Sequence, residues 1–146
     1  TFQAYGSDLD PAAVELSIQN AKRAGVVSRV HVAQRDVAEF VPPEEGKFLL
    51  MCNPPYGERM MTAAEVKALY RTMGKVFSMR EGANYFIISP DEEFEEAFGR
   101  PADKRRKLYN GMIKCQLYMY FRNLPRPAAG PNKLRPPKGR PPRTRK

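Results

Sequence analysis

The stretch FLLMCNPPY, residues 48–56, combines the signals of a buried strand with those of a strand end. It begins with a continuous apolar run, residues 48–52, which is typical of a strand buried on both faces of a parallel sheet. Asn53 and two prolines follow directly. Because proline fixes φ and lacks a backbone donor, the strand must end there. A polar side chain at the carboxyl end of such a strand lies where open α/β sheets bind their ligands.

Strand patterns recur on both sides of this stretch. Strands are predicted at residues 1–8, 29–34, 48–52 and 84–89. Residues 107–121 predict an antiparallel hairpin that turns at Asn110-Gly111, a strong short-range turn signal. Strands that alternate with helices and end in a hairpin predict an α/β domain with an open, mostly parallel sheet.

The helices between these strands carry start signals of their own. Asp10 is a capping residue, and Pro11 suits the first helical position. Thr62 and Glu65 form a capping-box pattern before a long apolar stripe. A short acidic helix is predicted over residues 90–98.

Charge divides the chain into two parts. The formal net charge is +9, and residues 123–146 carry no acidic residue and many prolines. This composition predicts a Pro-rich, basic, disordered tail after a folded domain at residues 1–122. The tail either contacts phosphates non-specifically or only solubilises the chain. No apolar run is long enough to span a membrane, and two distant cysteines suggest a reducing cytoplasm and no metal site.

Polar groups stand at three predicted strand ends, namely Asp8, Asp36 and Asn53. Carboxylates at these positions can accept hydrogen bonds from ribose hydroxyls. Asp is also common there as a turn former or helix cap, which is the alternative interpretation of Asp36 taken alone. The three together favour a nucleotide-like ligand.

Residues 53–56 have the groups needed to activate an exocyclic amine. The Asn53 side-chain carbonyl and the Pro54 main-chain carbonyl can accept its two hydrogens, which frees the nitrogen lone pair and stabilises developing positive charge. Tyr56 can stack on the base and hold it in line with an electrophile. This suits methyl transfer from a sulfonium donor. The alternative is a turn that proline stiffens.

The string NPPY resembles the catalytic motif of S-adenosylmethionine-dependent amino methyltransferases, which have the Rossmann-like class I fold. The strings GSDLDP and RDV resemble the second- and third-strand motifs of that fold. The resemblance implies S-adenosyl-L-methionine as the cofactor. It assigns catalytic roles to Asn53, Pro54, Pro55 and Tyr56, and cofactor contacts to Asp8, Leu9, Asp36 and Val37.

The longer strings NPPYGERM and KRRKLYNGMIKCQLYMY resemble the bacterial large-subunit ribosomal RNA guanine-N2 methyltransferases, also labelled adenine-specific DNA methylases. This implies that guanine in 23S ribosomal RNA is the substrate. NPPY alone also fits DNA adenine and protein glutamine methyltransferases. A non-catalytic RNA-binding remnant is a third interpretation, because the family's glycine-rich loop has no match here.

That loop follows the first strand of the family fold, so we expect both the strand and the loop to be missing from this chain. The strands at residues 2–7 and 48–52 should then not hydrogen-bond to each other, and this fragment alone should be inactive.

Three further features complete the candidate list. The basic run of Lys104, Arg105, Arg106 and Lys107 precedes the predicted hairpin and is either an RNA-binding surface or a solvated loop. His31, inside a strand, is expected to be structural. Cys52 could act as a nucleophile, but a core role is favoured by its apolar neighbours.

Overall fold

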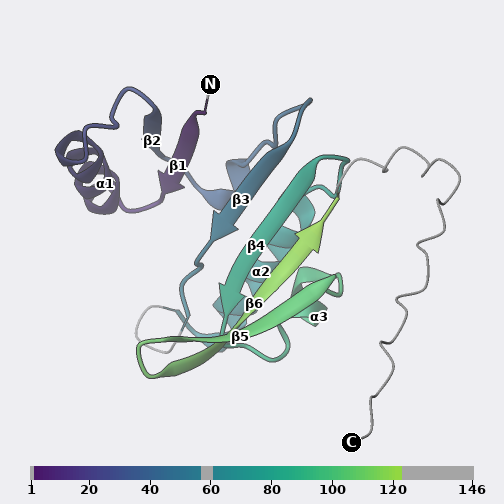
Figure 1. The fold of residues 1–146 in the computed structure, drawn as a ribbon. Helices are drawn as coiled ribbons and strands as arrows, with labels where there is room; N and C mark the ends of the chain where they lie inside the picture. The colour runs from purple at the N-terminus through teal and green to yellow at the C-terminus, as the bar shows by residue number, and fades with distance from the viewer. Residues whose placement is uncertain (1, 57–60, 123–146) are drawn as a thin grey trace, which may run out of the picture.

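The computed structural model describes residues 2–56 and 61–122, and the predicted tail at 123–146 lies outside them. The described strands form a two-stranded and a four-stranded sheet (Figure 1). In the first, β1 (Ala4–Asp8) pairs in parallel with β2 (Val30–Gln34). The second has the order β3-β4-β6-β5. Its strands are β3 (Phe48–Cys52), β4 (Ala83–Ser89), β5 (Lys104–Asn110) and β6 (Ile113–Phe121).

Helices connect and cover these sheets. Helix α1 (Pro11–Arg23) links β1 to β2 and packs on them, while α2 (Ala63–Val76) and α3 (Phe94–Phe98) lie on one face of the larger sheet (Figure 1). The short 3-10 helix η1 (Val37–Glu39) contacts α2. Since β3 pairs in parallel with β4 and antiparallel strands follow, the predicted α/β architecture is confirmed.

The predicted starts of the first two helices, α1 and α2, are also confirmed. The Asp10 carboxylate accepts a hydrogen bond from the Ala12 amide at 2.9 Å. At the start of α2, Thr62 Oγ1 accepts from the Glu65 amide at 3.3 Å, and the Glu65 carboxylate accepts from the Thr62 amide at 2.7 Å. Both caps satisfy backbone donors that have no partner within the helix.

Strands β1 and β3 lie in different sheets, as expected from the resemblance. Within the described residues, β1 pairs with β2 alone and β3 with β4 alone. Each therefore has one edge whose backbone groups have no strand partner among these residues. Such edges are template positions for a further strand.

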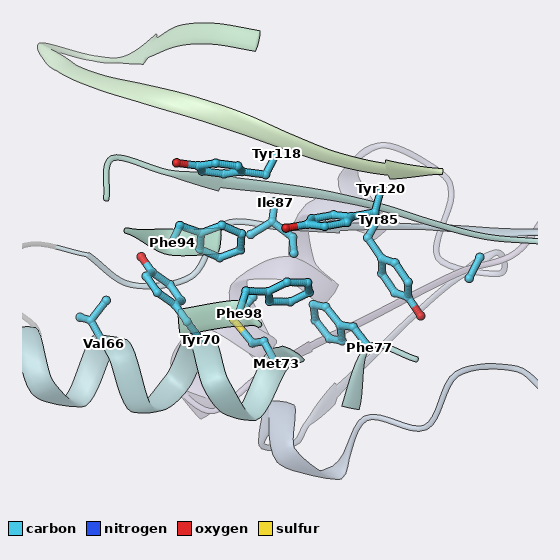
Figure 2. Close-up of a cluster of buried hydrophobic side chains, with 11 residues drawn as sticks. Val66, Tyr70, Met73, Phe77, Tyr85, Ile87, Phe94, Phe98, Tyr118 and Tyr120 are labelled. Atoms are coloured by element: carbon cyan, nitrogen blue, oxygen red, sulfur yellow. The ribbon is translucent and has the colours of Figure 1, made fainter. Parts of the chain in front are cut away.

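The core is an aromatic cluster between the four-stranded sheet and helices α2 and α3 (Figure 2). The Phe77 and Tyr85 rings stack with their centroids 5.2 Å apart, and the Tyr70 hydroxyl lies 2.8 Å from Ser89 Oγ. Figure 2 shows Tyr118 and Tyr120 of β6 pointing into the same layer. This packing holds β3 and β4 rigidly, and their ends position the candidate site.

The expectation that residues 48–52 are buried on both faces is wrong. Leu49 is 60% exposed and Met51 is 76% exposed, whereas Phe48, Leu50 and Cys52 are half-buried. Alternate side chains of a strand point to opposite faces. In the described part of the chain, helices cover one of these faces, so the other apolar set remains in solvent.

The boundaries of the hairpin and of the acidic helix also differ from the sequence predictions. The hairpin begins earlier, at Lys104, and its turn residues are Gly111 and Met112, because Asn110 pairs with Ile113. Gly111 has a φ of 59°, which suits the first central position of a two-residue hairpin turn. The acidic helix starts at Phe94 instead of Pro90, since Asp91 Oδ1 accepts from the Glu93 amide and forms a local turn.

Candidate active site

The three predicted strand-end groups follow parallel strands. Asp8 ends β1, Asp36 comes two residues after β2, and Asn53 follows β3 directly. Figure 1 shows the arrowheads of β1, β3 and β4 pointing in the same general direction. The carboxyl ends of these parallel strands therefore point the same way, and ligands of α/β sheets bind at such ends.

Asp8 and Asp36 both make local hydrogen bonds. Asp8 Oδ1 accepts from the Asp10 amide at 2.9 Å, and Asp36 Oδ1 accepts from the Ala38 amide at 2.8 Å. Both residues thus form turns, as the alternative interpretation of Asp36 proposed. Both are exposed, and in the described part of the chain no hydrogen bond reaches either Oδ2. Each carboxylate has a free oxygen held in a fixed direction.

Two hydrogen bonds join the ends of β1 and β2, one between backbone groups and one from a side chain to the backbone. The Arg35 amide donates to the Asp8 carbonyl at 3.0 Å, and Gln34 Nε2 donates to the Leu9 carbonyl at 3.1 Å. Leu9 is 64% exposed, while Val37 is half-buried and packs against the core cluster. These residues fit a nucleoside, because they offer two anionic acceptors beside apolar surface.

The motif at residues 53–56 is anchored at two points. Asn53 is exposed, whereas Pro54 behind it is buried and Tyr56 is half-buried. The Tyr56 hydroxyl accepts a hydrogen bond from Asn110 Nδ2, which lies at the end of β5. The side chain of Asn53 therefore projects into solvent from a rigid support, with an oriented aromatic ring close by in the chain.

Asn110 is a site residue that the sequence interpretation missed. The sequence pattern indicates only a hairpin turn at Asn110, because a contact between residues 54 positions apart leaves no local pattern. The one sequence feature that could have indicated a site role is its place in LYNG, part of the string KRRKLYNGMIKCQLYMY that resembles the ribosomal RNA methyltransferases. The structure brings it to the hydroxyl of the motif tyrosine.

Cys52 does not have the properties of a nucleophile. It is half-buried, and burial raises the pKa of its thiol to about 11. A thiol with this pKa stays protonated at neutral pH and is a weak nucleophile. His31 lies near the start of β2, at the end opposite Asp36, where its ring stacks on Tyr5 with centroids 5.1 Å apart. Both residues have structural contacts.

The basic run is part of a strand and not a loop before the hairpin. It makes up the first residues of β5, the edge strand of the larger sheet. Arg105 Nε donates to Glu95 Oε1 at 3.0 Å, and its guanidinium lies 5.9 Å from the centroid of the Tyr118 ring. Lys104 and Arg106 project from the opposite face, since side chains alternate along a strand. The Arg105 head group is therefore already paired with Glu95, although its side chain is 56% exposed.

The described residues include no group of three metal-ligating side chains, and no helix among them is long and apolar enough to cross a membrane. The site instead offers acceptors: the free oxygens of Asp8 and Asp36, and the Asn53 side chain.

A model of the RMKL-like methyltransferase domain matches residues 1–119. The chain belongs to the RMKL-like methyltransferase family. This confirms the predicted Rossmann-like methyltransferase fold and, for the family, S-adenosyl-L-methionine as the cofactor.

Two relatives of this RMKL-like chain have informative names. It is 36% identical over 117 residues to YpsC of Bacillus subtilis, which is provisionally named an RNA methyltransferase. The matched segment covers 80% of this chain and 30% of YpsC. It is also 35% identical over 119 residues to ribosomal RNA large subunit methyltransferase K/L of Hahella chejuensis. That matched segment covers 80% of this chain and 17% of the relative.

Solved structures agree with the family assignment. SMU.472, a provisionally named methyltransferase whose structure is complexed with SAH, is 38% identical to this chain. The two structures superpose with a TM-score of 0.76, over 81% of this chain and 31% of the SMU.472 chain. A predicted N6-adenine-specific DNA methylase from Listeria monocytogenes is 36% identical with a TM-score of 0.69, over 80% of this chain and 30% of its own. The chain spans less than a third of the length of these four proteins.

Proposed function

We propose that the complete protein transfers a methyl group from S-adenosyl-L-methionine to the exocyclic N2 amine of guanine in 23S ribosomal RNA. The observation that carries this proposal is the arrangement of residues 53–56. Asn53 follows β3 directly and is exposed, while the next residue, Pro54, is buried. The side chain of Asn110 donates a hydrogen bond to the Tyr56 hydroxyl and so orients its ring. The names of the relatives support RNA as the substrate class.

The four motif residues have distinct roles in this reaction. Asn53 Oδ1 and the Pro54 carbonyl accept the two amine hydrogens, so the nitrogen lone pair is no longer delocalised into the ring. Pro55 keeps the backbone rigid, and Tyr56 stacks on the base. The cofactor supplies an electrophilic methyl carbon on a positively charged sulfur. Methyl transfer would form a bond between the amine nitrogen and that carbon as the carbon–sulfur bond breaks, and the nitrogen would then release a proton to solvent. These acceptors stabilise the positive charge that develops on nitrogen.

The ends of β1 and β2 are proposed to hold the nucleoside part of the cofactor. Asp8 Oδ2 would accept from the ribose hydroxyls, as carboxylates at strand ends do in related α/β folds. Asp36 Oδ2 would accept from the adenine amine. Leu9 and Val37 would cover the adenine with apolar surface.

The RNA surface is proposed to include Lys104, Arg106 and Lys107, which are exposed on the edge strand. Arg105 was predicted to share this role, but its contacts with Glu95 and Tyr118 make it a packing residue in our proposal. The tail at 123–146 would add non-specific phosphate contacts, and the cytoplasm is the proposed location.

DNA adenine methylation is a second candidate. The name of the Listeria monocytogenes neighbour favours it, because adenine also carries an exocyclic amine. The protein glutamine and RNA-binding-remnant alternatives have no comparable observation in their favour.

The test is methyl transfer by the complete protein from labelled S-adenosyl-L-methionine to ribosomal RNA, genomic DNA and a ribosomal protein extract. The proposal predicts label in RNA, recovered as N2-methylguanosine after nuclease digestion. Asn53→Ala should lower the rate by roughly 10²–10³-fold, as loss of an oxyanion-hole donor does, with cofactor binding unchanged. Asp8→Ala should instead weaken cofactor binding in calorimetry. Recovery of the label in N6-methyladenine or in methylated glutamine would show that the substrate is DNA adenine or protein glutamine instead of guanine in RNA.

The residue 1–146 fragment by itself should not methylate RNA. Its β1 and β3 edges have no strand partner in the described structure, so Asp8 and Asn53 lie on two sheets that no hydrogen-bonded strand joins. Measurable turnover by this fragment would contradict that expectation.

A further inference from the structure

The end of the β5–β6 hairpin exposes an aromatic ring between two lysines. Tyr109 is 60% exposed, and Lys107 Nζ lies 5.4 Å from the centroid of its ring. Lys114 is the cross-strand partner of Tyr109 in β6 and is also exposed. Residues directly opposite in a sheet point to the same face, as do residues two apart along a strand. The three side chains therefore share one face of the hairpin.

This ring differs from the other tyrosines of the hairpin. Tyr118 and Tyr120 are 1% and 0% exposed and belong to the aromatic core. Tyr109 lies beyond the part of β5 where Arg105 contacts Glu95 of α3. An exposed ring flanked by cations is the arrangement with which proteins bind single-stranded nucleic acid, since bases stack on the ring and phosphates contact the lysines.

The position of the ring relates it to the candidate catalytic motif. Asn110, the next residue, donates a hydrogen bond to the Tyr56 hydroxyl. Figure 1 shows the turn of the hairpin projecting beyond the carboxyl end of β4. Successive side chains on a strand point to opposite faces, so Tyr109 and Asn110 face opposite sides of β5. A base stacked on Tyr109 is therefore not the base stacked on Tyr56.

We propose that Tyr109 is a stacking platform for a nucleotide that flanks the methylated base, and that Lys107 and Lys114 contact the adjoining phosphates. This inference rests on RNA being the substrate in the proposed function. It adds a recognition site outside the motif at 53–56. Its role is to hold the strand on either side of an unstacked base, which favours extrusion of that base toward Asn53.

The test measures equilibrium binding of the complete protein to a short single-stranded oligouridine that carries one guanosine. Tyr109→Ala should weaken binding by roughly 5- to 100-fold, the effect expected for one lost base–aromatic stack. Tyr109→Phe should bind like the natural protein, because the ring alone is needed. Met112→Ala is the matched control, since Met112 is 97% exposed in the same hairpin and has no ring.

A second set of RNAs locates the stacked nucleotide. Abasic sites are placed in turn at each position around the guanosine. At one flanking position, the abasic RNA should bind as weakly as the Tyr109→Ala variant binds intact RNA, and combining both changes should cause no further loss. Unchanged binding by Tyr109→Ala, or additive losses at every position, would overturn the platform.

Methylation distinguishes this inference from the proposed function. If the platform is correct, Tyr109→Ala raises KM for RNA more than it lowers kcat. Tyr109-dependent RNA binding without methylation of any RNA would overturn the proposed function, and with it the placement of the stacked nucleotide beside a methylated base. Methylation of guanine in RNA that is indifferent to Tyr109 would overturn the platform alone.

Discussion

Asn110 Nδ2 donates a hydrogen bond to the hydroxyl of Tyr56, which lies 54 residues earlier in the chain. The bond joins the end of the edge strand β5 to the motif that follows β3. A ring that must stack on a base has to be held in one orientation, because misplacement of a positioning group lowers the rate. Asn110 is therefore a positioning residue for Tyr56 in the proposed reaction.

Asn110→Ala should lower kcat for RNA methylation in the complete protein by roughly 2- to 10-fold, the equivalent of one hydrogen bond. Cofactor affinity should not change. Tyr56→Phe removes the same bond from the other side, so the two substitutions together should cost no more than either alone. Additive losses in single-turnover rates would show that Asn110 acts independently of Tyr56.

The basic residues of β5 should separate into two classes by salt dependence. Each phosphate contact to a single strand contributes about 0.7 to the slope of log K against log salt. Replacing Lys104, Arg106 and Lys107 with Ser should therefore flatten the slope by roughly two units in RNA-binding titrations.

Arg105→Ser is the matched control for that measurement. The Arg105 side chain is 56% exposed and that of its partner Glu95 is 15% exposed, so loss of this pair should lower the free energy of unfolding by at most about 1 kcal/mol. It should leave the salt slope as it was. A slope that changed with Arg105 alone would place this residue on the RNA instead.

Gly74 should not tolerate alanine, although it lies inside helix α2. Alanine is the better helix former by about 1 kcal/mol. A Cβ on Gly74, however, would lie 2.0 Å from the carbonyl oxygen of Phe98 in α3. The Gly74→Ala change should thus lower the free energy of unfolding by roughly 1–3 kcal/mol, measured in urea. Lys75→Ala, at the exposed next position, should change it little.

Cys52 should make stability fall at alkaline pH. Burial raises the pKa of its thiol from 9.0 to about 11, so between these values the unfolded chain has released the proton and the folded chain retains it. The unfolded state then binds fewer protons, and stability decreases as pH rises. Relative to Cys52→Ala, the natural protein should lose about 2 kcal/mol between pH 9 and 11 in urea unfolding. A difference that stays constant from pH 7 to 11 would contradict the shift.

Local features of the chain were predictable because their causes are local. The Asp10 cap and the Thr62–Glu65 capping box depend on residues within one helical turn, and both form as expected. The strand at 48–52 and its end at Asn53 follow from an apolar run and two prolines. The lack of pairing between β1 and β3 was predicted from the family resemblance, through the strand that has no match here.

Other features depend on how distant strands and helices pack, and no local pattern encodes that. The apolar run at 48–52 does not indicate that Leu49 and Met51 remain exposed, since exposure depends on which helices cover the sheet. The basic run could not reveal that Arg105 pairs with Glu95, because strand alternation and the position of α3 select that residue. The contact between Asn110 and Tyr56 arises for the same reason. The register of β5 against β6 sets where the hairpin turns, and this brings an asparagine to the motif tyrosine.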